Sequence, residues 1–160
     1  VATPGTDGET RSRLHIKASD DGGNSWSASW PVPYFVPPGT GNVFSDQFLP
    51  GLAVDSLGGL HVFWYQSNMP DAAPSTTYHL HHTRVANFGT PTQSNTPIVT
   101  LTQSGAFFSG QAPIQPALGD YIGVTAAGQA VYVAYPDDDP NATTQEKLRV
   151  FIRRIDNELP

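Results

Sequence analysis

Three short stretches of this sequence hold side chains that could bind a metal ion or take part in catalysis. The first, SDDGGNSW at residues 19–26, combines adjacent carboxylates with glycines. The second, HLHHT at residues 79–83, places His79 and His81 at alternate positions, where imidazoles on one face of a strand could bind a metal ion. The third, DDDPN, begins with three carboxylates that could supply oxygen ligands to Ca²⁺.

Each stretch also has a simpler structural interpretation, which we prefer. His79 and His81 have no nearby carboxylate to complete a ligand set, so we expect exposed histidines on a strand. In residues 19–26 no glutamate follows where an EF-hand loop needs its bidentate ligand. We expect a solvated turn at the three consecutive aspartates, with Ca²⁺ as the alternative; these are Asp137, Asp138 and Asp139.

Composition indicates an all-β protein and excludes several classes of partner. Glycine and proline number 15 each, which disfavours long helices, while periodic apolar runs argue against disorder. The net charge is −6 and the only lysines are Lys17 and Lys147, so no basic surface is available for nucleic acid. No apolar run approaches the length of a membrane span. The absence of cysteine excludes disulfides and thiolate metal sites.

Few lysines and a surface rich in Ser, Thr and Gly are typical of an extracellular or cell-surface bacterial protein. The chain begins at Val1 without a signal peptide, so we expect a processed product or a piece of a longer protein. The NAT tripeptide at Asn141 is a glycosylation sequon, which has a meaning only in a eukaryotic secretory pathway.

Alternating apolar residues predict hairpins. Residues 13–19 read as a strand, and residues 19–26 form the turn to a second strand on which Trp26 and Trp30 share a face. Residues 52–65 predict another hairpin. In its second strand both faces are largely apolar, as expected of a strand buried between layers: Val62 and Trp64 face one way, and His61, Phe63 and Tyr65 the other.

The second hairpin is repeated 70 residues later. LAVDSLGGLHVFWY aligns without a gap with IGVTAAGQAVYVAY at residues 122–135, so that Gly58 matches Gly128 and Tyr65 matches Tyr135. Each copy leads through a polar loop into a further strand. Such repetition predicts an architecture in which each unit needs neighbours to bury its faces.

Residues 143–159 fit two patterns. The strand pattern places Leu148, Val150 and Ile152 on one face, and we favour it because the repeat requires a third strand here. The alternative is a helix, whose spacing is met by Leu148, Phe151, Ile152, Ile155 and Leu159.

SDDGGNSW resembles the Asp-box, the S-x-D-x-G-x-T-W turn of sialidases and other BNR-repeat proteins. The matching residues are Ser19, Asp21, Gly23 and Trp26, while Ser25 replaces the usual Thr. The two repeated hairpins also look like the first two strands of blades in bacterial sialidase-like propellers, so the resemblance covers most of the chain. In that family the box is a structural turn between the third and fourth strands, away from the active site.

The residue types explain why such a turn is stable. The Asp21 carboxylate can accept hydrogen bonds from N–H groups within the turn. Gly23 can adopt a positive φ without a Cβ clash. We expect Trp26 to pack across the neighbouring strands as an apolar anchor.

The resemblance implies an all-β fold, a partial β-propeller with four-stranded antiparallel blades; a β-sandwich is the alternative. Residues 1–46 would hold the last two strands of a blade and a loop, 47–101 a complete blade, and 102–160 the first three strands of the next. About two and a quarter blades cannot close a propeller, which needs at least four. We therefore expect the remaining blades to come from the same precursor or from other chains, because open strand edges are a liability.

The resemblance to a propeller also implies where the functional residues would lie. Asp46 and Asp120 come just before the innermost strands, where a carboxylate could act as general acid or base on a glycoside; a strand cap is the simpler alternative. The FRIP arginine motif of sialidases is absent, and no glutamate has a suitable context, whether Glu9, Glu146 or Glu158. We expect a non-catalytic, extracellular sialidase-like propeller segment that acts as a scaffold or as a glycan- or protein-binding surface. The alternative is a portion of a sialidase-type glycoside hydrolase, completed by blades outside this chain.

Overall fold

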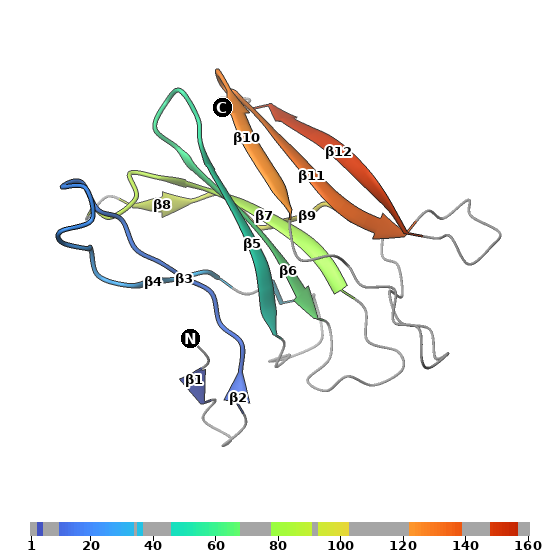
Figure 1. The fold of residues 1–160 in the computed structure, drawn as a ribbon, viewed down its shortest axis with the longest axis horizontal. Coiled ribbons are helices and arrows are strands. Elements are labelled where there is room, and N and C mark those ends of the chain that lie inside the picture. Colours follow the sequence, from blue (N-terminus) through green and yellow to red (C-terminus); the bar gives the residue numbers. More distant parts are fainter. Residues whose placement is uncertain are drawn as a thin grey trace.

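The computed structural model describes residues 3–4, 10–33, 35–36, 46–67, 78–90, 93–102, 122–138 and 148–156. Every regular element in this part of the chain is a β-strand, and all strand pairs are antiparallel (Figure 1). The all-β prediction is therefore confirmed. The strands are β1 (Thr3–Pro4), β2 (Thr10–Arg11), β3 (His15–Ile16), β4 (Trp30–Pro31), β5 (Gln47–Val54), β6 (Leu60–Ser67), β7 (Tyr78–Ala86), β8 (Ser94–Asn95), β9 (Val99–Thr100), β10 (Gly123–Ala127), β11 (Ala130–Asp138) and β12 (Leu148–Asp156).

The strands form separate antiparallel sheets. β1 pairs with β2, and β3 pairs with β4. The largest sheet runs β5–β6–β7, with β8 and β9 both paired to the outer edge of β7. The last sheet runs β10–β11–β12. These described strands form no closed barrel or propeller. Figure 1 shows the β10–β12 sheet on one side of β5–β7 and the β3–β4 pair on the other.

Strand β6 is buried on both faces, as its apolar pattern predicted. Val62 and Trp64 are inaccessible to solvent and pack in a cluster with Val32, beside β3 and β4. Phe63 and Tyr65 are equally buried in a second cluster, which they share with the side chains of β11. Because burying one large apolar side chain is worth about 1.5–3 kcal/mol, these two layers hold the sheets together.

The β5–β6 and β10–β11 hairpins approach each other closely at Gly51. A Cβ atom at this position would lie 2.5 Å from Val124 and 2.8 Å from Ile122. Glycine is therefore needed at residue 51, because any side chain would push the two sheets apart.

Residues 148–156 form a strand, so the strand interpretation of this segment is confirmed and the helical one is wrong. Phe151 and Ile155 are partly buried against the core between the sheets. Val150 and Ile152 lie on the opposite face, where they are 74% and 76% exposed. The outer face of β12 therefore exposes two large apolar side chains, next to the exposed ion pair of Arg154 and Asp156.

The gapless match between the two hairpins fails at the turn. The β5–β6 turn has five residues, 55–59, whereas two residues, Gly128 and Gln129, connect β10 to β11. Gly58 and Gly128 keep the same positive φ, 77° and 61°. Residues paired across two strands point to the same face of the sheet, and side chains alternate between the faces along each strand. A five-residue turn and a two-residue turn therefore place the aligned residues of β6 and β11 on opposite faces of their sheets. The predicted equivalence of Tyr65 and Tyr135 is therefore wrong: the two side chains meet from opposite sheets in one core.

Candidate functional site

The Asp-box stretch is a turn between β3 and β4, held by the Asp21 carboxylate. Its Oδ1 accepts the Ser25 N–H at 2.9 Å, and its Oδ2 accepts the Ser25 hydroxyl at 2.7 Å. The Ser19 hydroxyl donates to Oδ1 at 2.8 Å and accepts the Gly23 N–H at 2.8 Å. Gly23 has a φ of 93°. The bonds from Ser25, then that from Ser19, hold the pKa of Asp21 well below its usual value, because they stabilise the ionised carboxylate.

Trp26 does not anchor the sheet, and that expectation is wrong. Its side chain is 60% exposed and lies beside Gly23. Trp30 is the tryptophan that packs inward, with its ring edge-on to Phe88 at 5.8 Å, against the cluster of Val62. The reason is that β4 contains only Trp30 and Pro31, so strand alternation does not extend back to Trp26.

The start of β5 and the end of β6 meet at Asp46, at the end of the sheet opposite the hairpin turns. Asp46 Oδ1 accepts the backbone N–H of Ser12 at 2.7 Å. The Asp46 N–H donates to the Ser67 hydroxyl at 2.9 Å, and its carbonyl accepts the Ser67 N–H at 3.0 Å. Asp46 thus links three segments of chain, through one carboxylate oxygen and through its own backbone N–H and C=O groups. Asp120 lies outside the described residues, as do Glu9, Glu146, Glu158 and Asn141.

Aromatic rings lie beside Asp46. Tyr78 pairs with Ser67 in the sheet register, and Phe48 packs edge-on to Tyr78 at 5.2 Å. Burial, and then the charge of Asp46, raise the pKa of Tyr78, so its phenol stays protonated at neutral pH. We name Asp46, Phe48, Ser67 and Tyr78 the strand-end site. It combines a half-buried carboxylate, two rings and hydroxyl groups, a set that can bind a polyhydroxylated ligand.

The three aspartates do not form a solvated turn where the structure describes them. Asp137 and Asp138 are the last residues of β11, and the Asp137 side chain is 7% exposed. Burial, and then the Asp137 charge, raise the pKa of both Tyr65 and Tyr135. Asp139 lies outside the described residues. Within the described ranges no group of three or more histidine, aspartate or glutamate side chains is placed to hold a metal ion.

The expectation of exposed strand histidines is also wrong. His81 is 2% exposed and stacks on Phe35 at 4.8 Å, and its Nδ1 lies 3.2 Å from the Thr100 hydroxyl. His79 is half-buried, and its Nδ1 lies 3.3 Å from the Thr102 hydroxyl. Burial lowers the pKa of both imidazoles, that of His81 to about 3. Both histidines are therefore neutral groups on β7 that contact the hydroxyls of Thr100 in β9 and of Thr102 just after it.

Sequence reasoning missed a buried network around the β5–β6 turn. Asp55 Oδ1 accepts the N–H groups of Leu57 and Gly59, both at 2.8 Å. Its Oδ2 accepts Nε of Arg84 at 2.7 Å and lies 3.2 Å from His61 Nε2. Burial works against ionisation, but Arg84 and Gly59 still hold the pKa of Asp55 well below its usual value.

The network continues to a second histidine. His61 Nδ1 lies 2.9 Å from His82 Nε2, and both rings stack within the core beside Phe63. Burial lowers the pKa of both imidazoles, that of His82 to about 3. The sequence did contain a signal for this network, because polar residues occupy inward-facing positions on two neighbouring strands. His61 on β6 lies opposite Arg84 on β7 in the register. With the Asp55 and His61 side chains fully buried, the network fastens the turn to β7 and does not meet a substrate.

Comparison of the chain with protein-family models, with curated proteins and with solved structures gives no match. In the part of the chain that the structure describes, no helix has the length and apolar character needed to cross a membrane.

Proposed function

We propose that this chain is a segment of an extracellular Asp-box β-propeller, in which it serves as a scaffold and glycan-binding surface without a catalytic set of its own. The observation that carries the proposal is the Asp21 turn, whose carboxylate binds Ser19 and Ser25 in the manner that the box pattern requires. This turn joins two adjacent antiparallel strands, as the third and fourth strands of a blade would be joined.

The stacking of the sheets gives further support. The β5–β7 sheet is covered on one face by β3–β4 and on the other by β10–β12. The outer face of β12 remains open, with Val150 and Ile152 largely exposed. A further blade packed on this face would bury both side chains. The remaining blades, from the same precursor or from other chains, are thus the expected partners, and a cell-surface bacterial location suits the composition.

The strand-end site is the proposed ligand-binding part of this segment. Its carboxylate can accept sugar hydroxyls, and the partly buried rings of Phe48 and Tyr78, which pack edge-on to each other, can make apolar contacts with a pyranose. Asp46 Oδ1 is already occupied by the Ser12 N–H at 2.7 Å, which favours a fixed binding role over proton transfer.

Titration calorimetry of the protein with sialylated and neutral oligosaccharides tests this proposal. Wild type should bind one of these glycans, and Tyr78→Ala should weaken binding by up to about tenfold, since an aromatic contact is worth on the order of 0.5–1.5 kcal/mol. Trp26→Ala is a matched control, because that exposed aromatic ring lies in the box turn and is not part of the strand-end site. Equal binding by Tyr78→Ala and wild type would contradict the assignment of the site.

The alternative function is a share in a sialidase-type glycoside hydrolase. The observation that favours it is a half-buried carboxylate, Asp46, at the end of the sheet, where burial and then the Asp46 charge raise the pKa of the Tyr78 phenol. Hydrolysis of a fluorogenic sialoside by the intact protein, abolished in Asp46→Ala or Asp120→Ala, would establish this alternative and overturn the non-catalytic proposal.

A further inference from the structure

Positive charge is sparse in this sequence and is absent from the segments that adjoin the strand-end site. The eight lysine and arginine residues fall at residues 11–17, 84 and 147–154. Residues 37–45, which lead into the site, and residues 68–77, which connect its two later members, contain neither lysine nor arginine. Their only charged side chain is that of Asp71. The sequence that adjoins the site on both sides is therefore neutral or acidic.

Three of the described arginines bind groups outside the strand-end site. Arg84 binds the buried Asp55 carboxylate at 2.7 Å beside the β5–β6 turn, and Arg154 binds Asp156 at 2.6 Å on β12. Arg153 donates from its Nη1 to a backbone carbonyl at 3.0 Å. Each of these cations therefore already has a partner of its own.

Two further arginines flank Ser12, the residue whose N–H binds Asp46. Of these two, Arg13 has a described side chain, which is half-buried. In the part of the chain that the structure describes, no ion pair joins an arginine or a lysine to Asp46. The charge of Asp46 is therefore not neutralised by a direct cationic partner among these residues.

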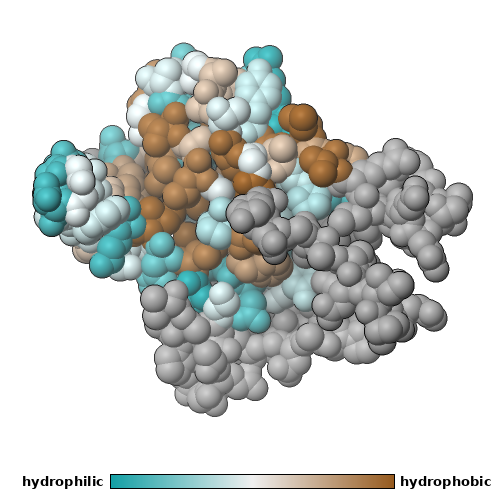
Figure 2. Space-filling model, viewed as in Figure 1, coloured by the Kyte–Doolittle hydropathy of each residue, from teal (hydrophilic) through white to brown (hydrophobic). Residues whose placement is uncertain are grey.

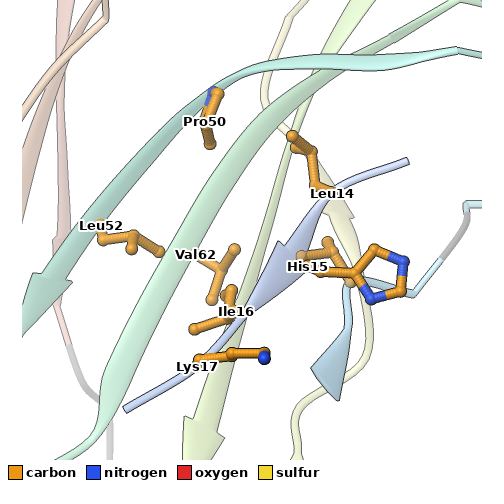
Figure 3. A pocket seen from close by; sticks show the side chains of 8 residues that line it. Leu14, His15, Ile16, Lys17, Pro50, Leu52 and Val62 are labelled. Carbon is orange, nitrogen blue, oxygen red and sulfur yellow. The ribbon is translucent and has the colours of Figure 1, made fainter. Parts of the chain in front are cut away.

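Lys17 belongs to a different surface of the molecule. Apolar residues gather at the centre of the face seen in Figure 2. An apolar groove of about 190 Å³ lies between β3 and the β5–β6 hairpin, and Figure 3 shows Lys17 among the side chains that line it. No residue of the strand-end site lines this groove. The only lysine among the described residues is thus part of a separate, mainly apolar surface.

The Asp46 carboxylate keeps one oxygen available for a ligand. Its Oδ1 accepts the Ser12 N–H at 2.7 Å, and no described residue donates to its Oδ2. The side chain is half-buried, so the carboxylate is held in place and still accessible. Burial, and then the Asp46 charge, raise the pKa of Tyr78. The Asp46 charge thus opposes a negative charge on the neighbouring phenol, and it would oppose one on a ligand in the same way.

We propose that the strand-end site binds neutral glycans and discriminates against sialylated ones, and that Asp46 is the residue that makes this selection. A hydroxyl of a neutral sugar can donate to Asp46 Oδ2, whereas the ionised carboxylate of a sialic acid can only accept hydrogen bonds. That carboxylate would also meet a like charge that no described cation offsets. The inference rests on the proposed glycan-binding function, whose ligand class it names. It also argues against the sialidase alternative, whose substrate carries that carboxylate.

Pairs of oligosaccharides that differ only in a terminal sialic acid test this inference, with lactose and 3′-sialyllactose as one such pair. A glycan array identifies the pairs that the intact protein binds, and titration calorimetry then measures both members of a pair. The neutral member should bind more tightly by about fivefold or more, the effect of one like charge a few ångströms away in water. This preference should shrink between about 0.05 M and about 1 M NaCl, because salt screens exposed charges.

The Asp46→Asn variant tests whether this residue is responsible. The asparagine carbonyl can still accept the Ser12 N–H, but the side chain carries no charge. The variant should reduce the ratio of the two dissociation constants to less than about twofold. Asp20→Asn is the matched control, because it removes one charge from an exposed residue of the box turn and should leave the ratio unchanged. If circular dichroism shows that Asp46→Asn does not fold, the salt dependence of the wild-type ratio decides instead.

Two outcomes would overturn the inference while the proposed function stands. Equal or tighter binding of the sialylated member would establish glycan binding but contradict the selection against sialic acid. The same ratio in Asp46→Asn and in wild type would assign the selection to another residue. Binding of neither member of any pair is a different result, because it contradicts the proposed function itself and the inference with it.

Discussion

Gln47 and Gln66 lie directly opposite each other on β5 and β6, and both buried side-chain amides bind the backbone of the neighbouring sheet segment. Gln47 Oε1 accepts the Leu14 N–H at 3.2 Å, and its Nε2 donates to the Pro33 carbonyl at 3.0 Å. Gln66 exchanges two bonds with Phe35, accepting its N–H at 3.1 Å and donating to its carbonyl at 2.7 Å. The pair thus joins two sheets by bonds like those of a strand ladder.

Replacing Gln66 with leucine should therefore destabilise the protein. Gln66→Leu keeps the volume but leaves the N–H and C=O of Phe35 without their partners, which should lower the free energy of unfolding by about 1–3 kcal/mol. Urea denaturation followed by tryptophan fluorescence measures the change. Gln129→Leu, at an exposed turn position, is the matched control and should have little effect. A loss at Gln66 no larger than that at Gln129 would show that the amide bonds do not hold the sheets.

Gly59 should not tolerate alanine. A Cβ atom there would overlap the Arg84 guanidinium, which binds the buried Asp55 carboxylate. Gly59→Ala should lower the free energy of unfolding by about 1.5–3 kcal/mol, because it displaces the guanidinium that binds the buried Asp55 carboxylate. Gly123→Ala is the control, since its Cβ would make an ordinary 3.7 Å contact with Ala134. Similar unfolding midpoints for the two variants would mean that Arg84 does not depend on this close approach.

Stability should fall as the pH drops below about 6.5, the ordinary pKa of histidine. Burial lowers the folded-state pKa of His81 and His82 to about 3. Between pH 6.5 and 3 the unfolded chain therefore binds protons that the folded chain does not bind. Each of these histidines then contributes a slope of up to about 1.4 kcal/mol per pH unit between 6.5 and the folded value, and none above it. The lowered pKa values of Asp21 and Asp55 affect the stability only below about pH 4, where these carboxylates become protonated on unfolding.

Urea titrations at pH 8.0, 6.5 and 5.0 measure this dependence. The His82→Gln variant should be less stable at pH 8.0 but should lose less on acidification than the wild type, because one proton-binding group has been removed. Parallel pH profiles for the two proteins would show that His82 does not titrate on unfolding.

The two tryptophans of the first hairpin should differ sharply on truncation. Trp30→Ala removes a ring that packs on Phe88 and should cost about 3 kcal/mol, near the lower end for a buried aromatic. Trp26→Ala removes a side chain that is 60% exposed and should change stability by less than about 0.5 kcal/mol. Thermal unfolding followed by circular dichroism compares the pair. A larger loss of stability for Trp26→Ala than for Trp30→Ala would show that Trp26 is the anchoring residue after all.

Local interactions explain what the sequence by itself determined. The Asp21 turn is made by residues no more than four positions apart, so its donors and acceptor can be read directly from the order of residue types. The two apolar faces of β6 follow from side-chain alternation, which strand geometry imposes on any sequence. The strand at 148–156 was favoured over a helix because it repeated the order of elements after the first hairpin.

Only the tertiary structure decided features that depend on residues distant along the chain. Arg84 reaches Asp55 across 29 positions, and His82 reaches His61 across 21, which no local pattern encodes. The difference in turn length placed Tyr135 opposite Tyr65 in one core, although the two align in sequence. His81 became buried because Phe35 and β9 cover it. Local sequence determines turns and the alternation of side chains along a strand, whereas burial depends on which distant segments of the chain pack on that strand and exclude water.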